Sequence, residues 1–146
     1  AIVSTDDEEI AEIAQRCGAE VPFLRPADLA ADDTLDLPVF LHALDWLERV
    51  DRWQPDLVVH LRPTSPLRPP GLVDAAIGAL RHRADLHAVR SVMVAGQNPY
   101  KMWRLGDDGR LTPLLTDQGL DACNRPRQAL PTTYWQTGHV DVAWVT

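Results

Sequence analysis

The chain has 146 residues, of which 45% are apolar, and its formal net charge at pH 7 is −7. This length and composition are typical of a single folded domain. The negative charge argues against non-specific binding to nucleic acid, and no apolar run approaches the ~20 residues that a membrane-spanning helix needs. The two cysteines are too few for a disulfide framework and lack metal-ligand spacing. We therefore expect a cytoplasmic protein that binds neither nucleic acid nor membranes.

Predicted strands and helices alternate along the chain, followed by an irregular region from 95 to 131. The expected elements, in chain order, are strand 1–4, helix 5–17, strand 21–24, helix 36–50, strand 57–61, helix 72–80, strand 86–94 and strand 134–145. Such alternation favours a mostly parallel sheet with helices on both faces and right-handed crossovers. We therefore expect an α/β fold in which ligands bind beyond the carboxyl ends of the strands.

A proline-rich loop, Arg62-Pro63-Thr64-Ser65-Pro66-Leu67-Arg68, directly follows the most apolar predicted strand. Its prolines restrict the backbone, while two hydroxyls and two arginines supply hydrogen-bond donors. A rigid loop of donors at the carboxyl end of a strand is what pre-organised anion binding requires. We interpret this loop as one wall of an anion-binding site.

Two earlier strand ends carry polar residues with open interpretations. Arg25 leaves the second predicted strand, either as a surface residue or with its guanidinium aimed at a base carbonyl or a phosphate. Asp32, Asp33 and Asp36 either form a solvated loop with a helix cap, or accept from ribose hydroxyls or contact a divalent ion.

Arginines, amides and aromatic rings gather late in the chain, in segments 124–128 and 134–139. In this group, Arg127 can pair with a carboxylate while an aromatic ring stacks on a sugar. Lys101 is a further candidate cation. These residue types indicate a polar ligand that carries a carboxylate, such as an acidic sugar.

At this point three segments resemble the acylneuraminate cytidylyltransferases, the family of CMP-sialic acid synthetases. The segments lie in the family's order and are 3–30, 61–68 and 126–131, with Gly138 beyond them. The resemblance implies a Rossmann-like nucleotidyltransferase fold and a homodimer. It also implies a reaction in which the hydroxyl of an acidic sugar attacks the α-phosphate of CTP, with Mg²⁺, and pyrophosphate is released.

The resemblance assigns roles residue by residue. Arg25 matches a nucleotide-contacting arginine of the family, and Arg127 matches an arginine of its sugar pocket. Lys101 falls where some members have a lysine near that pocket. Arg62 stands where many members have a glutamine that touches the sugar, and Asp36 stands where a nucleotide-binding serine is common.

Residue types and resemblance together predict two sets of binding residues. The nucleotide-binding set comprises Arg25, Asp36, Thr64 and Ser65. The substrate-binding set comprises Arg62, Lys101, Arg127, Gln128, Trp135 and Thr137. Trp135, Gln136 and Thr137 replace the family's more usual Arg-Pro-Asn, which leaves another ulosonic acid or a phosphonate open as the substrate.

The resemblance also predicts what lies beyond both ends of the chain. The basic, glycine-rich loop that grips the triphosphate would precede Ala1, and the metal-holding aspartates would follow Thr146. We expect residues 1–146 to form one truncated cytidylyltransferase domain, inactive alone, with its Mg²⁺ ligands outside the segment. A non-catalytic domain of the same fold that binds a nucleotide or a sugar is the alternative.

Overall fold

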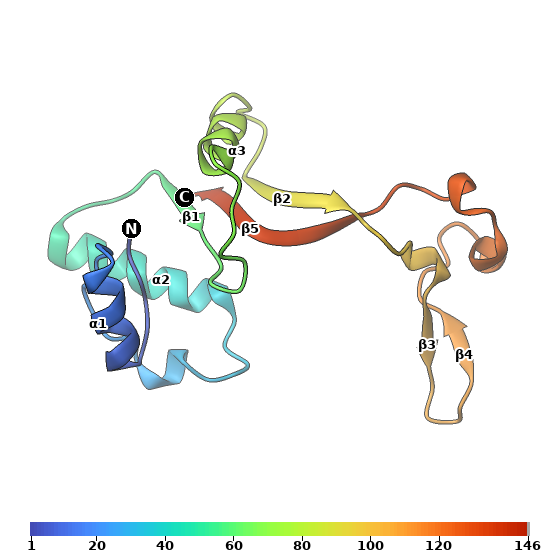
Figure 1. Ribbon diagram of the computed structural model, residues 1–146, viewed down its shortest axis with the longest axis horizontal. Coiled ribbons are helices and arrows are strands. Elements are labelled where there is room, and N and C mark those ends of the chain that lie inside the picture. Colours follow the sequence, from blue (N-terminus) through green and yellow to red (C-terminus); the bar gives the residue numbers. More distant parts are fainter. Residues whose placement is uncertain (146) are drawn as a thin grey trace. The chain divides into compact units, whose positions relative to one another are not determined.

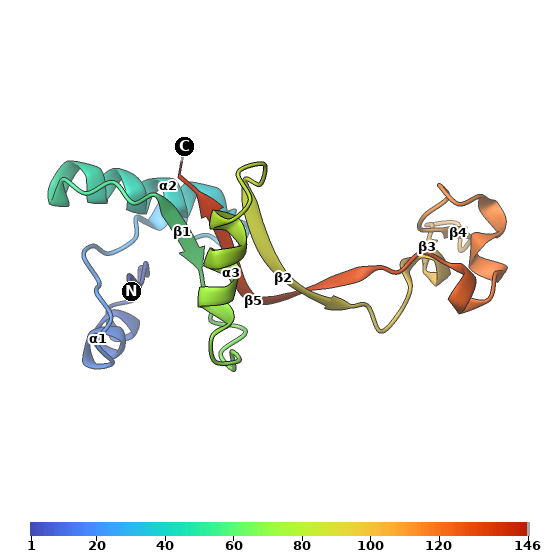
Figure 2. The ribbon, with the colours of Figure 1, turned by 90° about the horizontal axis from the view of Figure 1, so that it is seen from above.

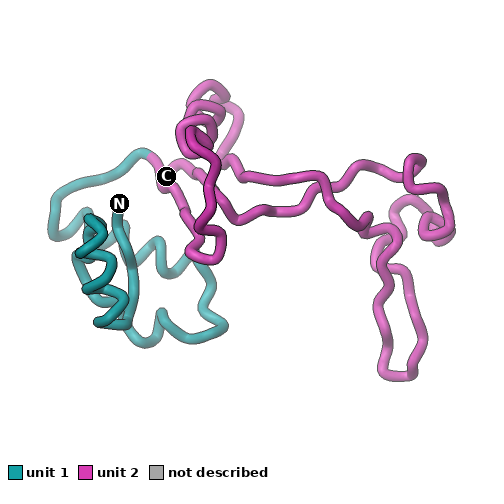
Figure 3. The backbone as a smooth tube through the Cα atoms, in the orientation of Figure 1, with its two compact units in different colours: residues 1–56 teal, residues 57–146 magenta. Residues whose placement is uncertain are grey.

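The structure, a computed structural model, describes residues 1–145; Thr146, the last residue of the predicted domain, lies outside the described residues. The chain divides into two compact units, residues 1–56 and 57–146 (Figure 3). The helices are α1 (Glu8–Arg16), α2 (Asp36–Trp46) and α3 (Leu72–Arg81). The strands are β1 (Leu57–His60), β2 (Ala88–Val94), β3 (Trp103–Leu105), β4 (Leu111–Pro113) and β5 (Tyr134–Trp144) (Figure 1). Short helical turns are η1 (Ala27–Leu29), η2 (Leu47–Asp51), η3 (Pro99–Lys101), η4 (Leu120–Asn124) and η5 (Arg127–Ala129).

In the first unit, the segment before α1 pairs in parallel with the segment after it. Val3 N donates to Glu20 O at 2.9 Å, and Arg25 N donates to Thr5 O at 2.7 Å. The residue pairs Ile2–Glu20 and Thr5–Leu24 form isolated parallel bridges. The strands predicted at 1–4 and 21–24 are therefore represented by these two bridges and not by a continuous ladder.

The two helices of this unit begin in different ways. The carboxylate of Asp7 caps α1 by accepting from Ile10 N at 2.9 Å, as expected for an acidic N-cap residue. α2 begins after Leu35 without a side-chain cap, so Asp36 is the first residue of the helix and not its cap. α2 then continues as the π-helical turn η2, which ends at Asp51 and is followed by Arg52, a residue with a φ of 56°.

The second unit contains a three-stranded sheet with the order β1-β5-β2. β5 is antiparallel to both of its neighbours, and α3 packs against β2 and β5 (Figures 1 and 2). Leu80 of α3 and Val140 and Val142 of β5 are fully buried at this contact. The alternating pattern of β5 over these residues therefore directs its apolar side chains onto the helix.

This sheet corrects the prediction of a mostly parallel, Rossmann-like sheet with helices on both faces. β1 and β2 do run in the same direction, because both are antiparallel to β5, and α3 connects them as the alternation implies. They are not neighbours, however, since β5 lies between them and pairs with both. The order of elements along the chain predicted the direction of β1 and β2 but not the strand inserted between them.

The irregular region holds a small core of its own, formed by Tyr100, Ala122 and Leu130 with Leu115 against them. Beside it, β3 and β4 form a separate two-stranded antiparallel sheet (Figure 1). Within residues 1–145, none of the helices has the length and apolar character needed to cross a membrane.

Candidate functional site

The loop after β1, residues 62–68, is closed by hydrogen bonds within itself. Ser65 N donates to Arg62 O at 3.1 Å. The guanidinium of Arg68 folds back, and its Nη2 donates to the same carbonyl at 2.6 Å. The carbonyl of Arg62, at the start of the loop, therefore accepts from the middle and from the end of the loop. These bonds agree with a stiff loop, which its prolines also favour.

Two side chains of this loop also bind the backbone of β5. Ser65 Oγ donates to Thr137 O at 3.0 Å. Arg68 Nε donates to His139 O at 2.6 Å. Hydrogen bonds from charged donors are stronger than those between neutral groups, so the bond from Arg68 contributes most to holding the loop against the strand.

The carbonyls that accept these bonds belong to a bulge in β5. Arg90 pairs with Asp141, whereas Val92 pairs with Gln136, so the residues of β5 between these two partners all lie opposite Ser91. A bulge leaves ladder groups without strand partners and changes the direction of side chains. The bulge in β5 accordingly needs other hydrogen-bond partners for its backbone.

Two hydroxyls and a glycine accommodate the bulge. Ser91 Oγ accepts from Val140 N at 3.1 Å and from Thr137 Oγ1 at 2.7 Å. Gly138 has a φ of 72°, and a Cβ added there would lie 2.9 Å from Ser65 Oγ. Glycine is therefore required at this position both by backbone conformation and by the close approach of the loop.

A charged network surrounds Asp141 beside the bulge. Its Oδ1 accepts from Arg90 Nε at 2.8 Å, and its Oδ2 lies 3.7 Å from Arg62 Nη2. Arg90 Nη1 also donates to Gln136 Oε1 at 3.1 Å. One carboxylate therefore pairs with two guanidinium groups, which come from the loop and from β2.

Three members of this network, Arg90, Gln136 and Asp141, are absent from the two predicted binding sets, although Gln136 lies in the polar segment 134–139 identified from the sequence. A signal was present, because each charged residue interrupts an apolar strand: Arg90 follows Val89, and Asp141 lies between Val140 and Val142. Only the register of β5 shows that these side chains meet.

The structure brings three of the predicted residues together at the loop and the bulge: Arg62, Ser65 and Thr137. Thr64 belongs to the same loop and is exposed. Trp135 lies on β5 opposite Met93, with 66% of its surface exposed.

Arg25 and Asp36 belong to the first unit. The guanidinium of Arg25 donates to Ser4 O at 2.9 Å and to Leu29 O at 3.5 Å. The bond to Ser4 O joins the segment after α1 to the start of the chain. Arg25 therefore has a structural role in this unit. Asp36 is exposed at the start of α2.

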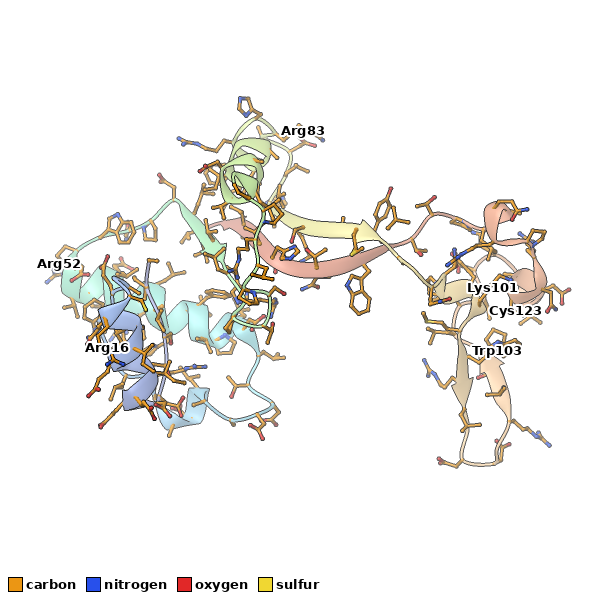
Figure 4. All side chains as sticks on the ribbon, viewed as in Figure 1. Arg16, Arg52, Arg83, Lys101, Trp103 and Cys123 are labelled. Carbon is orange, nitrogen blue, oxygen red and sulfur yellow. The ribbon has the colours of Figure 1, made fainter. Side chains whose placement is uncertain are left out.

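Lys101 and Arg127 lie near the second core, and both donate to backbone carbonyls. Lys101 Nζ donates to Cys123 O at 3.0 Å and to Arg125 O at 2.8 Å (Figure 4). Arg127 Nη2 donates to Gly96 O. These cations therefore stabilise the turns of the irregular region, and Gln128, next to Arg127, is exposed.

The second core also contains a hydrogen-bonded ionisable pair. Tyr100 Oη donates to Asp117 Oδ2 at 2.7 Å. This bond raises the pKa of Tyr100 and lowers the pKa of Asp117, because it stabilises the neutral phenol and the charged carboxylate together.

No group of three or more His, Cys, Asp or Glu residues that could hold a metal ion occurs in residues 1–145. Mg²⁺ favours oxygen ligands, chiefly carboxylates and water. The described residues therefore offer no cluster of three carboxylates to such an ion.

Comparison with known proteins gives two matches that cover about two thirds of the chain. The chain is 34% identical over 101 residues to the CMP-N,N'-diacetyllegionaminic acid synthase of Legionella pneumophila. The matched residues cover 69% of this chain and 40% of that protein. The chain is 35% identical over 99 residues to post-translational flagellin modification protein B of Campylobacter coli, covering 68% of this chain and 42% of that protein.

A shorter match is closer in sequence. Over 43 residues the chain is 56% identical to the CMP-N,N'-diacetyllegionaminic acid synthase of Campylobacter jejuni, covering 30% of this chain and 18% of that protein. No family model matches the chain. The chain spans about two fifths of the length of the first two relatives. The likeness to these relatives, together with the motifs at 3–30, 61–68 and 126–131, shows that the chain belongs to the CMP-sialic-acid-like synthetase family.

Proposed function

We propose that the protein containing this chain is a cytoplasmic cytidylyltransferase that joins CMP to a nonulosonic acid. The hydroxyl oxygen of the acid attacks the α-phosphorus of CTP and loses its proton to solvent. The bond from that phosphorus to the bridging oxygen of the β-phosphate breaks, and pyrophosphate leaves. Positioning and neutralisation of charge are the main demands of such a phosphoryl transfer.

The likeness to the Legionella pneumophila protein, named CMP-N,N'-diacetyllegionaminic acid synthase, carries this proposal. Its 101 matched residues cover more than two thirds of the chain, and the Campylobacter jejuni relative has the same name. Both names describe the attachment of CMP to one class of acidic sugar.

The geometry of loop 62–68 supports the proposal. Its hydrogen bonds hold Arg62 beside β5, where an arginine can neutralise a carboxylate or a phosphate. We propose Arg62 and Thr137 as acid-binding residues, and Thr64 and Ser65 as nucleotide-binding residues. Arg25 and Asp36 complete the proposed nucleotide set.

The other proposed acid-binding residues are Lys101, Arg127, Gln128 and Trp135. Lys101 and Arg127 each have N–H donors beyond those that they give to backbone carbonyls, so they can contact the ligand while these bonds remain. Trp135 offers an exposed aromatic surface that can stack on a sugar ring. None of these roles depends on the magnesium ion that the resemblance implies.

The reaction can be tested with full-length protein, CTP and a panel of acids. The panel contains N,N'-diacetyllegionaminic acid, N-acetylneuraminic acid, a 3-deoxy-ulosonic acid and a phosphonate. Pyrophosphate release and the CMP-conjugate are measured together, the latter by mass spectrometry. We expect both products in equal amounts with at least one nonulosonic acid. Absence of both products with every nonulosonic acid would refute the proposed function.

Substitution of Arg62 tests the choice of acid. Arg62→Gln introduces the residue that many members of the family carry, so we expect a changed order of preference among the acids with turnover retained. Arg83→Gln is the matched control, because Arg83 pairs with Asp85 by two exposed hydrogen bonds away from the loop. An unchanged order of preference in Arg62→Gln would remove Arg62 from the acid site.

We also propose that the protein forms a homodimer through the exposed apolar face of the β3–β4 hairpin. This face carries Trp103 opposite Pro113 and Leu105 opposite Leu111. A two-stranded sheet is marginally stable by itself in water, so a second copy that covers this face would stabilise both hairpins. Light scattering should give a dimer mass for the unaltered protein and a monomer mass for Leu105→Glu. Leu120→Glu, at another exposed leucine, is the control that should remain dimeric.

A further inference from the structure

Arg90 is held by two side chains but is not fully engaged by them. Asp141 accepts from its Nε at 2.8 Å and Gln136 accepts from its Nη1 at 3.1 Å. Among the described residues, no partner is recorded for its Nη2. The Arg90 side chain is 53% exposed, so this nitrogen can donate to a ligand from solvent.

The bulge in β5 is what brings both partners to Arg90. Asp141 is the strand partner of Arg90, and Gln136 lies five positions earlier, opposite Val92. In an unbroken ladder the partner of Val92 would be His139, so Gln136 would lie further along the strand. The bulge therefore places a carboxylate and an amide around one guanidinium, which fixes its orientation.

The network of Arg62, Arg90 and Asp141 has a net positive charge, which favours binding of one more anion. Arg62 and Arg90 carry one positive charge each and Asp141 carries one negative charge, so the three side chains together are positive. Asp141 is only 17% exposed and lies between the two arginines, which counteracts their mutual repulsion. An oxyanion that approaches Arg90 would meet a neutralising charge and a pre-oriented donor.

We propose that Arg90, beside Arg62, binds an oxyanion of a substrate, and that Asp141 and Gln136 are positioning residues for it. The oxyanion is the carboxylate of the acidic sugar or a phosphate of CTP, which share this chemistry. The inference rests on the proposed function for the identity of the ligand, but it concerns three strand residues outside the predicted binding sets.

The test compares Arg90→Gln with unaltered protein by isothermal titration calorimetry on the full-length protein. Three probes are titrated: N,N'-diacetyllegionaminic acid, its C1 methyl ester and CTP. Loss of a charged hydrogen-bond donor should weaken binding of the oxyanion by about tenfold or more. Binding of the ester should be unchanged, which also shows that the variant is folded. Arg83→Gln is the control, with all three affinities unchanged.

Each result decides the inference. Weaker binding of the acid but not of its ester or CTP identifies the sugar carboxylate as the ligand, and weaker binding of CTP alone identifies a phosphate. Equal affinities of Arg90→Gln and unaltered protein for both the acid and CTP overturn the inference. If neither probe binds the unaltered protein, the inference and the proposed function both fail. Binding that depends on Arg90 without any pyrophosphate release would overturn only the proposed function.

Discussion

Gly138→Ala adds one atom, a Cβ, at the contact between loop 62–68 and the bulge of β5. The glycine has a φ of 72°, in the left-handed region that favours glycine. The new Cβ would lie 2.9 Å from Ser65 Oγ, closer than carbon and oxygen can pack without movement. Ser65 Oγ donates to Thr137 O, so moving this oxygen aside breaks the hydrogen bond that fastens the loop.

Two costs therefore add in Gly138→Ala. The left-handed conformation costs roughly 1–2 kcal/mol for a residue with a Cβ. Loss of the hydrogen bond from Ser65 costs roughly 0.5–1.5 kcal/mol more. The sum predicts a decrease of about 1.5–3.5 kcal/mol in the free energy of unfolding.

Two further glycines, one before α3 and one inside it, separate these costs because an added Cβ would meet no neighbouring atom at either position. Gly71 has a φ of 76° with no atom within 4 Å of an added Cβ, so Gly71→Ala should cost only the conformational part, about 1–2 kcal/mol. Gly78 lies inside α3 with open space around it, so Gly78→Ala should stabilise by roughly 0.5–1 kcal/mol. Urea unfolding followed by circular dichroism measures all three.

The double variant Gly138→Ala with Ser65→Ala gives the decisive comparison. Removing the hydroxyl removes the clash, and the hydrogen bond is already lost in Gly138→Ala. The double variant should therefore be as stable as Gly138→Ala alone, although Ser65→Ala by itself costs roughly 0.5–1.5 kcal/mol. Additive losses in the double variant would refute the contact between Gly138 and Ser65 described here.

Three other predictions concern the cores and the loop. Leu80→Ala should lower the unfolding free energy by about 2–5 kcal/mol because Leu80 is fully buried, whereas Leu67→Ala, at a leucine 87% exposed, should change it little; urea unfolding checks both. Hydrogen bonding to Tyr100 lowers the pKa of Asp117 in the folded state, so this stabilisation is present above about pH 4 and is lost as the pH falls through the lowered pKa. In Asp117→Asn this part of the acid destabilisation should be absent from thermal melts taken at a series of pH values, and an acid transition identical to that of the unaltered protein would contradict the role of the pair. Arg68→Lys should destabilise by roughly 1–3 kcal/mol, since a lysine cannot reproduce two diverging guanidinium bonds to backbone carbonyls, and unchanged melting would contradict that role.

Local signals in the sequence predicted the helices well. The predicted helix 72–80 corresponds to α3 (Leu72–Arg81), and the predicted helix 36–50 corresponds to α2 followed by the π-helical turn η2. Each depends on apolar spacing within one short segment. The sheet was predicted wrongly because its order depends on pairing between β1 and β5, which are far apart in the sequence. The residue pattern within a strand does not specify which other strand will pair with it.

The candidate site likewise contains some residues that could be predicted from the sequence and others that could not. Loop 62–68 could be recognised because its prolines, hydroxyls and arginines are consecutive in the sequence. Arg90 and Asp141 could not be paired from the sequence, because their meeting depends on the register between β2 and β5. The bulge between 136 and 141 shifts that register within the strand, so even a correct list of strands would have misaligned Gln136.

The hydrogen bonds of loop 62–68 change what its donors can be expected to do. The sequence suggests that the hydroxyls and arginines of the loop face an anion together, but Ser65 and Arg68 donate to carbonyls of the loop and of β5. Their main effect is to hold the loop against the bulge. The bulge, in turn, aligns Arg90 with Asp141 and Gln136, and Nη2 of this half-exposed guanidinium has no hydrogen-bond partner among the described residues. In the proposed anion site, the rigid loop therefore acts largely by fixing the strand, while the donor best arranged for a ligand lies on β2.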